Sequence, residues 1–179
     1  MARNIIDLPT LGDDGKLYRD TAVDMVESLI PNLWKSCHAP DLLELENGDL
    51  LCCWFAGSRE GNADISIAVA RLPADAEQWE QPVIVSDDPT RSEQNPSLFQ
   101  NPNGDIWLMY TAQAAKKPDD NSDGSMQGTA EIRRKISRDG GRTWGPTEAV
   151  FTRPGSFCRQ KIQVLSNGRW TVSYTHLRA

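Results

Sequence analysis

Residues 137–144 read Ser-Arg-Asp-Gly-Gly-Arg-Thr-Trp, and no other stretch says as much about the fold. An aspartate oxygen can accept backbone N–H bonds, glycines allow positive φ, and a tryptophan can pack against a sheet. The stretch therefore predicts a rigid turn between two β-strands. We expect structural roles for five of its residues: Ser137, Asp139, Gly141, Thr143 and Trp144.

Three hairpins are predicted, two before this turn and one after it. Asn-Gly pairs stand at 47–48, 103–104 and 167–168, separated by 56 and then 64 residues, and each lies between apolar stretches. Because Asn-Gly accepts the positive φ values of a two-residue hairpin turn, each pair predicts two antiparallel strands. A degenerate copy of the 137–144 pattern lies one repeat earlier, at 75–79.

Two further strands are expected after each of the first two hairpins, at 65–70 and 79–86 and at 129–136 and 144–151. The second strands of these hairpins, 50–55 and 106–110, are apolar on both sides of the pleat, so both faces of each sheet must be covered. We therefore predict an all-β chain, a β-propeller of four-stranded antiparallel blades with about two and a half blades present. Only residues 22–30 show a helical pattern.

Composition and charge exclude several classes of partner. The chain has 25 acidic and 19 basic residues and a net charge of −6, the wrong sign for binding a phosphate backbone, so we expect no nucleic-acid partner. The first residues lack the apolar core of a secretory signal, and no stretch is long enough to cross a bilayer. We expect a cytoplasmic protein without a membrane partner or a cofactor. The four cysteines, without Cys-x-x-Cys spacing, are interpreted as reduced structural thiols.

Residues 119–124 imitate the first half of a calcium loop. The twelfth position of such a loop is Ala130 rather than a bidentate glutamate, so we expect a polar loop and no metal site.

Functional residues are expected on one face of the propeller. Connections in a four-stranded meander alternate between opposite ends of the strands, so the Asn-Gly turns and the 137–144 turn share one face. The other connections meet on the opposite face, around the mouth of the central channel. The segments expected there are 35–40, 57–64, 87–96, 112–128 and 154–161.

The stretch 137–144 matches the Ser-x-Asp-x-Gly-x-Thr-Trp pattern of the Asp box, or BNR repeat. Together with residues 38–51, 54–65 and 92–99, it makes the chain resemble the sialidase (neuraminidase) superfamily, and more closely its bacterial branch of predicted neuraminidases. The resemblance extends over about residues 38–170. It implies a six-bladed propeller and a glycoside hydrolase that releases a terminal sialic acid or a related anionic sugar. The family uses an arginine triad for the sugar carboxylate, an aspartate acid/base, and a tyrosine nucleophile helped by a glutamate.

The resemblance assigns roles to three residues. Arg59 resembles an early active-site arginine, whose planar fork suits a carboxylate, and Asp64 resembles the acid/base aspartate. His38 stands where typical sialidases have the arginine of an Arg-Ile-Pro motif. An imidazole cannot offer the bidentate fork, so carboxylate binding is weakened or the substrate differs. His38 is alternatively a base, a substrate donor, or a polar residue satisfied at the start of a strand.

Other candidates at the mouth are weighed against structural roles. Glu60, with Arg59 and Asp64, contributes to substrate binding or to a solvated loop with local ion pairs. Gln94 and Asn95 contact sugar hydroxyls or cap the turn before a proline. Arg159 is a second carboxylate clamp or an exposed cation at a strand end. We interpret Arg133 and Arg134, in the middle of a strand, as structural, and the thiol of Cys37 as a poor nucleophile candidate.

The expected organisation is an N-terminal extension with a possible closing strand (1–35), incomplete propeller blades (36–171) and a non-native tail (172–179). The nucleophile and remaining arginines of the family would lie in later blades, so we expect the isolated chain to be inactive. Two alternatives stay open: a propeller polysaccharide lyase or rhamnosidase with His38 as base, and a non-catalytic carbohydrate-binding propeller.

Overall fold

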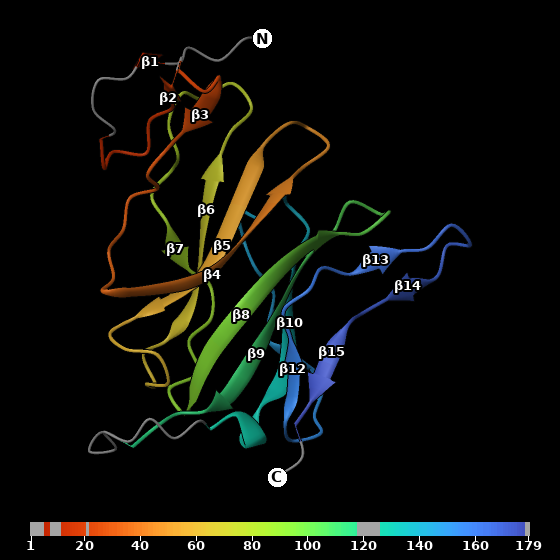
Figure 1. Cartoon of the computed structure of the whole chain (residues 1–179). Coiled ribbons are helices and arrows are strands. Elements are labelled where there is room, and N and C mark those ends of the chain that lie inside the picture. Colours follow the sequence, from red (N-terminus) through yellow and green to blue (C-terminus); the bar gives the residue numbers. More distant parts are fainter. Residues whose placement is uncertain (1–5, 8–11, 21, 118–125, 178–179) are drawn as a thin grey trace.

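The structure is a computed structural model that describes residues 6–7, 12–20, 22–117 and 126–177. Its described strands form two four-stranded antiparallel sheets, two two-stranded sheets and a three-stranded N-terminal sheet (Figure 1). The prediction of an all-β chain is confirmed. The helix within these ranges is the 3₁₀ turn η1 (Gln127–Thr129), so no described helix is long and apolar enough to cross a membrane.

The first two units are four-stranded meanders, each a propeller blade. Unit 1 consists of β4 (Ser36–Glu44), β5 (Leu50–Gly57), β6 (Ser66–Leu72) and β7 (Val83–Ile84). Unit 2 consists of β8 (Arg91–Gln100), β9 (Ile106–Ala114), β10 (Glu131–Ser137) and β11 (Glu148–Phe151). In both units the strands are hydrogen-bonded in sequence order, so β4 and β8 are edge strands, and these two strands lie against one another.

Unit 3 is one interrupted hairpin. Its strands are β12 (Ser156–Cys158), β13 (Gln163–Val164), β14 (Trp170–Thr171) and β15 (Tyr174–His176). β12 pairs with β15 and β13 with β14, all antiparallel. Two complete units and this hairpin correspond to the two and a half blades expected. Residues 174–176, which fall in the segment expected to be a non-native tail, pair with 156–158.

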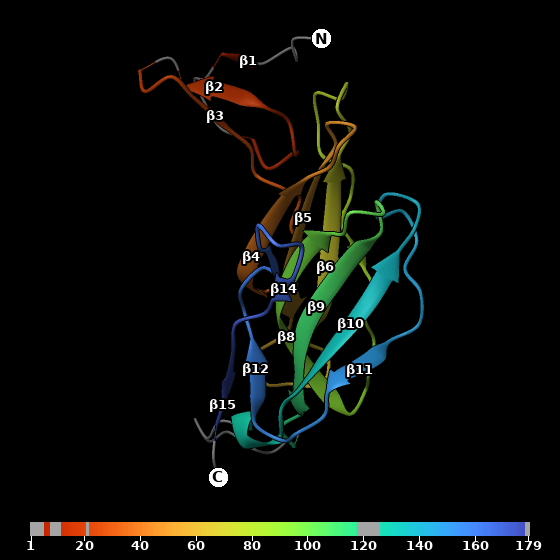
Figure 2. The ribbon, with the colours of Figure 1, turned by 90° about the vertical axis from the view of Figure 1, so that its right-hand side faces the viewer.

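The N-terminal extension forms a separate sheet of β1 (Ile6–Asp7), β2 (Tyr18–Asp20) and β3 (Met25–Glu27), which lies beyond one end of unit 1 (Figure 2). The helical pattern predicted for 22–30 is wrong, because β3 pairs with β2. The Asp20 carboxylate accepts a hydrogen bond from the Ala22 N–H, and Asp24, at φ 48°, completes the reversal between the two strands. Residues 15–17 also bond to the backbone of 77–79 beside unit 1.

The three Asn-Gly hairpins share one turn geometry, which differs from the two-residue turn predicted. The Gly48 N–H donates to the Leu45 carbonyl at 2.8 Å, and the Leu45 N–H donates to the Asp49 carbonyl at 2.8 Å. Only the glycine of the pair has positive φ, 83° at Gly48. This is a three-residue loop with a left-handed glycine that forms a bulge. The same bonds recur at 101–105 and 165–169.

Apolar contacts cover both faces of unit 1. Its inner face packs on unit 2, where Leu51, Phe55 and Ile67 meet Leu108 and Tyr110. The opposite face is covered by the N-terminal segment, whose buried and half-buried apolar residues contact β5 and β6: Leu17, Ile30 and Trp34. Cys52, Cys53 and Cys158 are buried free thiols, and burial raises the pKa of Cys52 and of Cys158 to about 11, whereas the free Cys37 is exposed.

The turn at 137–144 is locked by one carboxylate. Asp139 accepts hydrogen bonds from the Ser137 hydroxyl (2.8 Å), the Arg142 N–H (3.0 Å) and both the N–H and hydroxyl of Thr143 (2.9 and 2.5 Å). The bonds from Thr143 hold the pKa of Asp139 well below its usual range. Gly141, at φ 83°, lies so close to unit 1 that a Cβ there would be 2.7 Å from Leu51 Cδ1. The turn of unit 2 is therefore also a contact with unit 1.

We expect Asp139→Ala to destabilise the chain by about 1–2 kcal/mol, because four donors lose their acceptor, and to lower Tm by about 2–8 °C. A pKa lowered in the folded state contributes stability above the unfolded pKa of about 4, and this contribution is lost as pH falls below that value. Thermal melts at pH 7 and pH 3 measure both effects. Asp75→Ala is the matched control, since Asp75 accepts no hydrogen bond within the described chain. Equal melting of the two variants would contradict the prediction.

Candidate functional site

A pocket of about 550 Å³ lies between units 2 and 3, at the end of the strands opposite to the Asn-Gly turns. Four of the residues predicted from the sequence line it: Glu60, Gln94, Asn95 and Arg159. They come from the β5–β6 loop, from β8 and from the segment that follows β12. The structure thus brings together residues that are up to about 100 positions apart in the sequence.

A bulge in the edge strand β8 places Gln94 and Asn95. The pairing of β8 with β9 shifts register between Gln94 and Ser97, and Asn95 has φ 50° directly before Pro96. A left-handed asparagine stores backbone strain, and bulges of this kind redirect side chains beside functional sites. Gln94 is buried and its amide donates to the Ser92 hydroxyl at 3.0 Å.

Thr111 joins the two sides of the pocket. It is the register partner of Gln94 across β8 and β9, and it is fully buried. Its hydroxyl donates to the Cys158 carbonyl at 3.2 Å and accepts from the Cys158 N–H at 3.3 Å. This exchange fixes the residue that immediately precedes Arg159.

Arg159 is exposed and forms no ion pair or side-chain hydrogen bond with any described residue. Glu60 is the one carboxylate among the described residues that line this pocket. It lies in a loop anchored by the Lys116 N–H, which donates to the Gly61 carbonyl at 2.8 Å. The remaining lining is rich in amides and hydroxyls, so the pocket can offer one free guanidinium and several neutral donors and acceptors.

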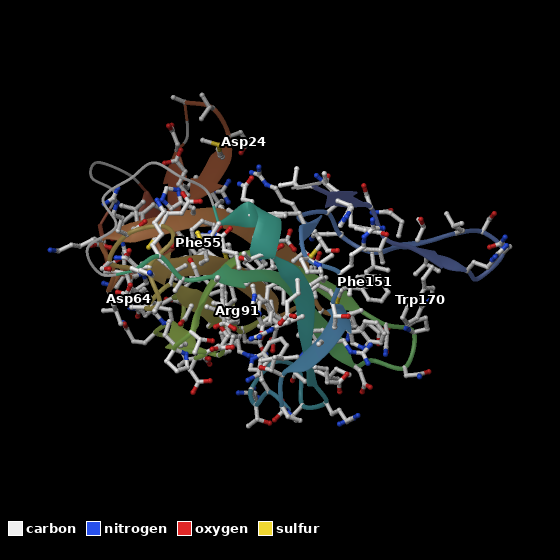
Figure 3. All side chains as sticks on the ribbon, turned by 90° about the horizontal axis from the view of Figure 1, so that it is seen from below. Asp24, Phe55, Asp64, Arg91, Phe151 and Trp170 are labelled. Atoms are coloured by element: carbon white, nitrogen blue, oxygen red, sulfur yellow. The ribbon has the colours of Figure 1, made fainter. Side chains whose placement is uncertain are left out.

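Asp64 and Arg59 are exposed residues of the same loop, but neither lines the pocket. The carboxylate of Asp64 accepts hydrogen bonds from the Ser58 N–H and the Ser58 hydroxyl, both at 2.9 Å, and so closes the loop. Seen from this end of the molecule, Asp64 lies at the side of unit 1, away from Phe151 of unit 2 (Figure 3).

His38 lies in a different place from the other candidates. Its ring stacks on Phe55 with centroids 5.2 Å apart, and its Nε2 is 3.1 Å from the Ser36 hydroxyl. It lines a separate cavity of about 480 Å³ that also contacts Trp54 and the N-terminal segment. The same bulge as in β8 occurs here, because β4 shifts register between His38 and Asp41 and Ala39 has φ 52°.

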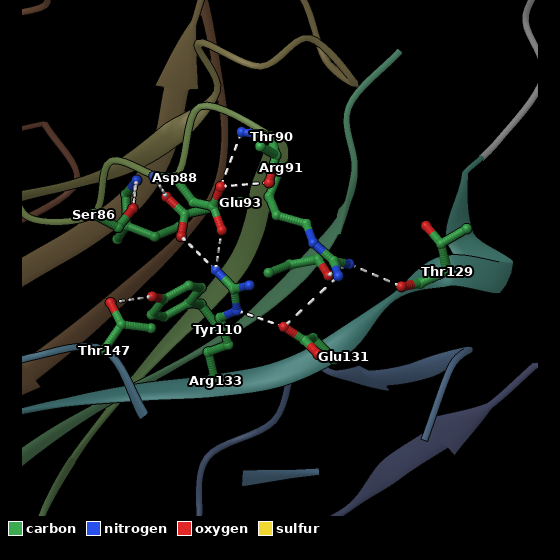
Figure 4. Close-up of polar contacts among 12 residues, drawn as sticks. Ser86, Asp88, Thr90, Arg91, Glu93, Tyr110, Thr129, Glu131, Arg133 and Thr147 are labelled. Carbon is green, nitrogen blue, oxygen red and sulfur yellow. Dashed lines mark hydrogen bonds and ion pairs between the residues drawn. The ribbon is translucent and has the colours of Figure 1, made fainter. Parts of the chain in front are cut away.

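A half-buried charged cluster around the buried Glu93 was not predicted (Figure 4). Glu93, adjacent to Gln94, is 1% exposed, and burial raises its pKa. Arg133 lies 3.8 Å from Glu93, and donates to Asp88 and Glu131 at 2.7 Å each. Burial acts to raise the pKa of Asp88, but hydrogen bonds from Thr90 and Arg133 lower it to about 2. The structural role interpreted for Arg133 is consistent with these contacts. The one sequence feature that could have indicated this cluster is an acidic residue, Glu93, inside the first strand of unit 2.

The polar loop 119–124, compared above with a calcium loop, lies outside the described residues.

Comparisons with known proteins agree with this architecture. A family model described as "BNR repeat-like domain" matches residues 48–179. A search of curated protein sequences found no significant match.

Three solved structures illustrate the similarity. The NanB sialidase from Streptococcus pneumoniae aligns with a TM-score of 0.60 and 11% identity over 79% of this chain and 41% of that one. A protein of unknown function from Dyadobacter fermentans gives 0.59 and 18% over 91% and 50%. An endo-arabinase from Bacteroides thetaiotaomicron gives 0.52 and 15% over 88% and 59%. The chain spans about half the length of these structures, and at these identities the similarity establishes the fold alone.

We expect Asp88→Asn to lower the free energy of unfolding by about 2 kcal/mol at pH 7, because the charged partner of Arg133 and Thr90 is removed. The pKa of Asp88 is lowered to about 2, so its contribution is complete above the unfolded pKa of about 4. It is lost as pH falls towards 2. Urea titrations from pH 7 to pH 2 should show the difference from the unchanged chain narrowing below pH 4. Asp87→Asn, at an exposed neighbour without a described partner, should show no such difference.

Proposed function

The chain belongs to the BNR repeat-like domain family, and we propose from this premise that it is part of a glycan-acting enzyme of the sialidase type. The reaction proposed is hydrolysis of the glycosidic bond to a terminal sialic acid or a related anionic sugar. The complete activity requires more of the fold than this chain covers, because the chain spans about half of the similar structures.

One observation carries the proposal: an arginine without a partner among the described residues lines a polar pocket at the predicted mouth. A guanidinium binds a carboxylate through two parallel charged hydrogen bonds, and the pair is stronger when it is shielded from water. Arg159 is available for such a bond, whereas Arg133 and Arg134 form ion pairs with acidic residues of unit 2 and of the link before it. The pocket therefore suits a ligand with one carboxylate and several hydroxyls.

The proposed roles follow from position. Arg159 holds the carboxylate, and Gln94 and Asn95 contact sugar hydroxyls from the bulge in β8. Glu60 approaches from the loop that also carries Arg59 and Asp64. For Asp64 to act as acid/base it must exchange its bonds to Ser58 for one to the substrate, which a loop rearrangement would allow.

A base role for His38 finds less support. It lines a separate cavity and stacks on Phe55, so it does not share the pocket with Arg159. We therefore place the lyase and rhamnosidase alternatives second. A non-catalytic carbohydrate-binding propeller uses the same pocket, and the measurements below distinguish it.

Ligand binding by the chain tests the carboxylate site. We expect 3′-sialyllactose to shift the amide NMR signals of residues 94–95 and 159–160 more strongly than lactose does. Arg159→Ala should weaken 3′-sialyllactose binding by about tenfold, because a charged bidentate contact is lost. Arg153→Ala is the control, at a nearby exposed arginine with no side-chain partner in the described ranges. Equal binding of the two sugars, or unchanged affinity of Arg159→Ala, would refute the assignment.

Product analysis by mass spectrometry on a protein extended to the whole propeller tests the chemistry. We expect free sialic acid from a sialoside, with Asp64→Ala about 10²–10⁴-fold slower, since a general acid is removed. An unsaturated uronate released from a uronate polysaccharide and abolished by His38→Ala would instead establish a lyase. Binding without any product would indicate a carbohydrate-binding propeller.

A further inference from the structure

Equivalent positions recur in the first strand of each unit. His38, Gln94 and Cys158 each lie ten residues before a hairpin glycine, Gly48, Gly104 or Gly168. At each of these positions the strand is interrupted, by the bulges of β4 and β8 and by the break between β12 and β13. The first strands of the three units are therefore interrupted at the same distance from their hairpins, by a left-handed residue before a proline in units 1 and 2 and by a break in strand pairing in unit 3.

Three residues further along, the equivalent residues are Asp41, Ser97 and Lys161. Two of them meet between units that are not neighbours in the sequence: Lys161 Nζ is 3.3 Å from Asp41 Oδ1 and also donates to the Leu42 carbonyl. Asp41 Oδ2 accepts the Leu98 N–H of unit 2 at 2.8 Å. One carboxylate of unit 1 thus contacts unit 2 and unit 3.

The Asp41–Lys161 contact lies two residues after Arg159 and fixes one end of the segment that carries it. On one side of Arg159, Cys158 is held by the hydroxyl of Thr111. On the other side, Lys161 is held by Asp41. Only Arg159 and Gln160 lie between these two anchors, and both line the pocket. Cys158 and Ile162 also hold this segment by their burial, so losing the Lys161 contact would shift the backbone that carries the guanidinium without detaching it.

We propose that the Asp41–Lys161 ion pair is a positioning contact that orients Arg159 in the pocket and thereby sets its affinity for an anionic sugar. The affinity part of the inference rests on the proposed function, whereas the orientation of Arg159 does not. Neither residue touches the ligand in this proposal. Asp41 and Lys161 act through the backbone of the two residues that separate Lys161 from Cys158.

The ligand-free chain tests the contact itself. Asp41→Asn keeps an oxygen that can accept from the Leu98 N–H, and Lys161→Met keeps the length of the side chain. A double-mutant cycle of urea stability should show that the two changes are not additive. The amide signal of Arg159 should shift in Lys161→Met and return in Lys161→Arg. An additive cycle together with an unmoved Arg159 signal would overturn the proposal.

Affinity tests the consequence. Lys161→Met should weaken 3′-sialyllactose binding by about fivefold, in the range of a partly exposed ion pair, and leave lactose binding unchanged. Lys161→Arg should restore the affinity. Lys35→Met, at an exposed lysine with no ion pair among the described residues, should bind as the unchanged chain does. An unmoved affinity in Lys161→Met would limit the pair to a structural link and overturn the positioning role.

The failure of the proposed function gives a different result. If the unchanged chain binds no 3′-sialyllactose, the sialidase proposal is overturned. The Arg159 signal in the ligand-free variants still decides whether Lys161 orients that residue.

Discussion

The structure depends on the fact that the central strands are apolar on both faces of their sheets. β5 buries Leu51, Cys53 and Phe55 against unit 2, and its alternate residues Cys52 and Trp54 pack under the N-terminal segment. A sheet of this kind is not stable with one face in water, so each unit requires a cover on either side. Stacking units side by side meets this requirement. It also means that pockets form where neighbouring units meet.

The proposed pocket illustrates this dependence. Unit 2 supplies Gln94 and Asn95, unit 3 supplies Arg159, and the β5–β6 loop of unit 1 supplies Glu60. Each residue lies in a loop, just after a strand or in a bulge, where the regular sheet stops determining the direction of side chains. The relative positions of the pocket residues therefore depend on how the three units pack together. Contacts between units affect these positions even when they lie outside the pocket.

The sequence predicted those features that are set by local chemistry. The Asn-Gly pairs located all three hairpins, and Asp139 forms the lock expected of it, but the turn type was wrong because only the glycines adopt positive φ. Strand alternation and loop position placed Gln94, Asn95 and Arg159 at one end of the sheets. The sequence alone could not indicate that Asp64 is held by Ser58, nor that Lys161 reaches Asp41, because these contacts depend on side-chain direction and on packing across units.

The two bulges with a left-handed residue have one further consequence. β4 and β8 are edge strands that lie against each other, and exposed edges tend to pair with any strand that comes near. At each bulge the residue after the left-handed one is a proline, Pro40 or Pro96, which has no N–H to offer. The facing edges therefore lack a backbone donor at this level and cannot pair into one continuous sheet there, so units 1 and 2 remain separate sheets that pack through side chains.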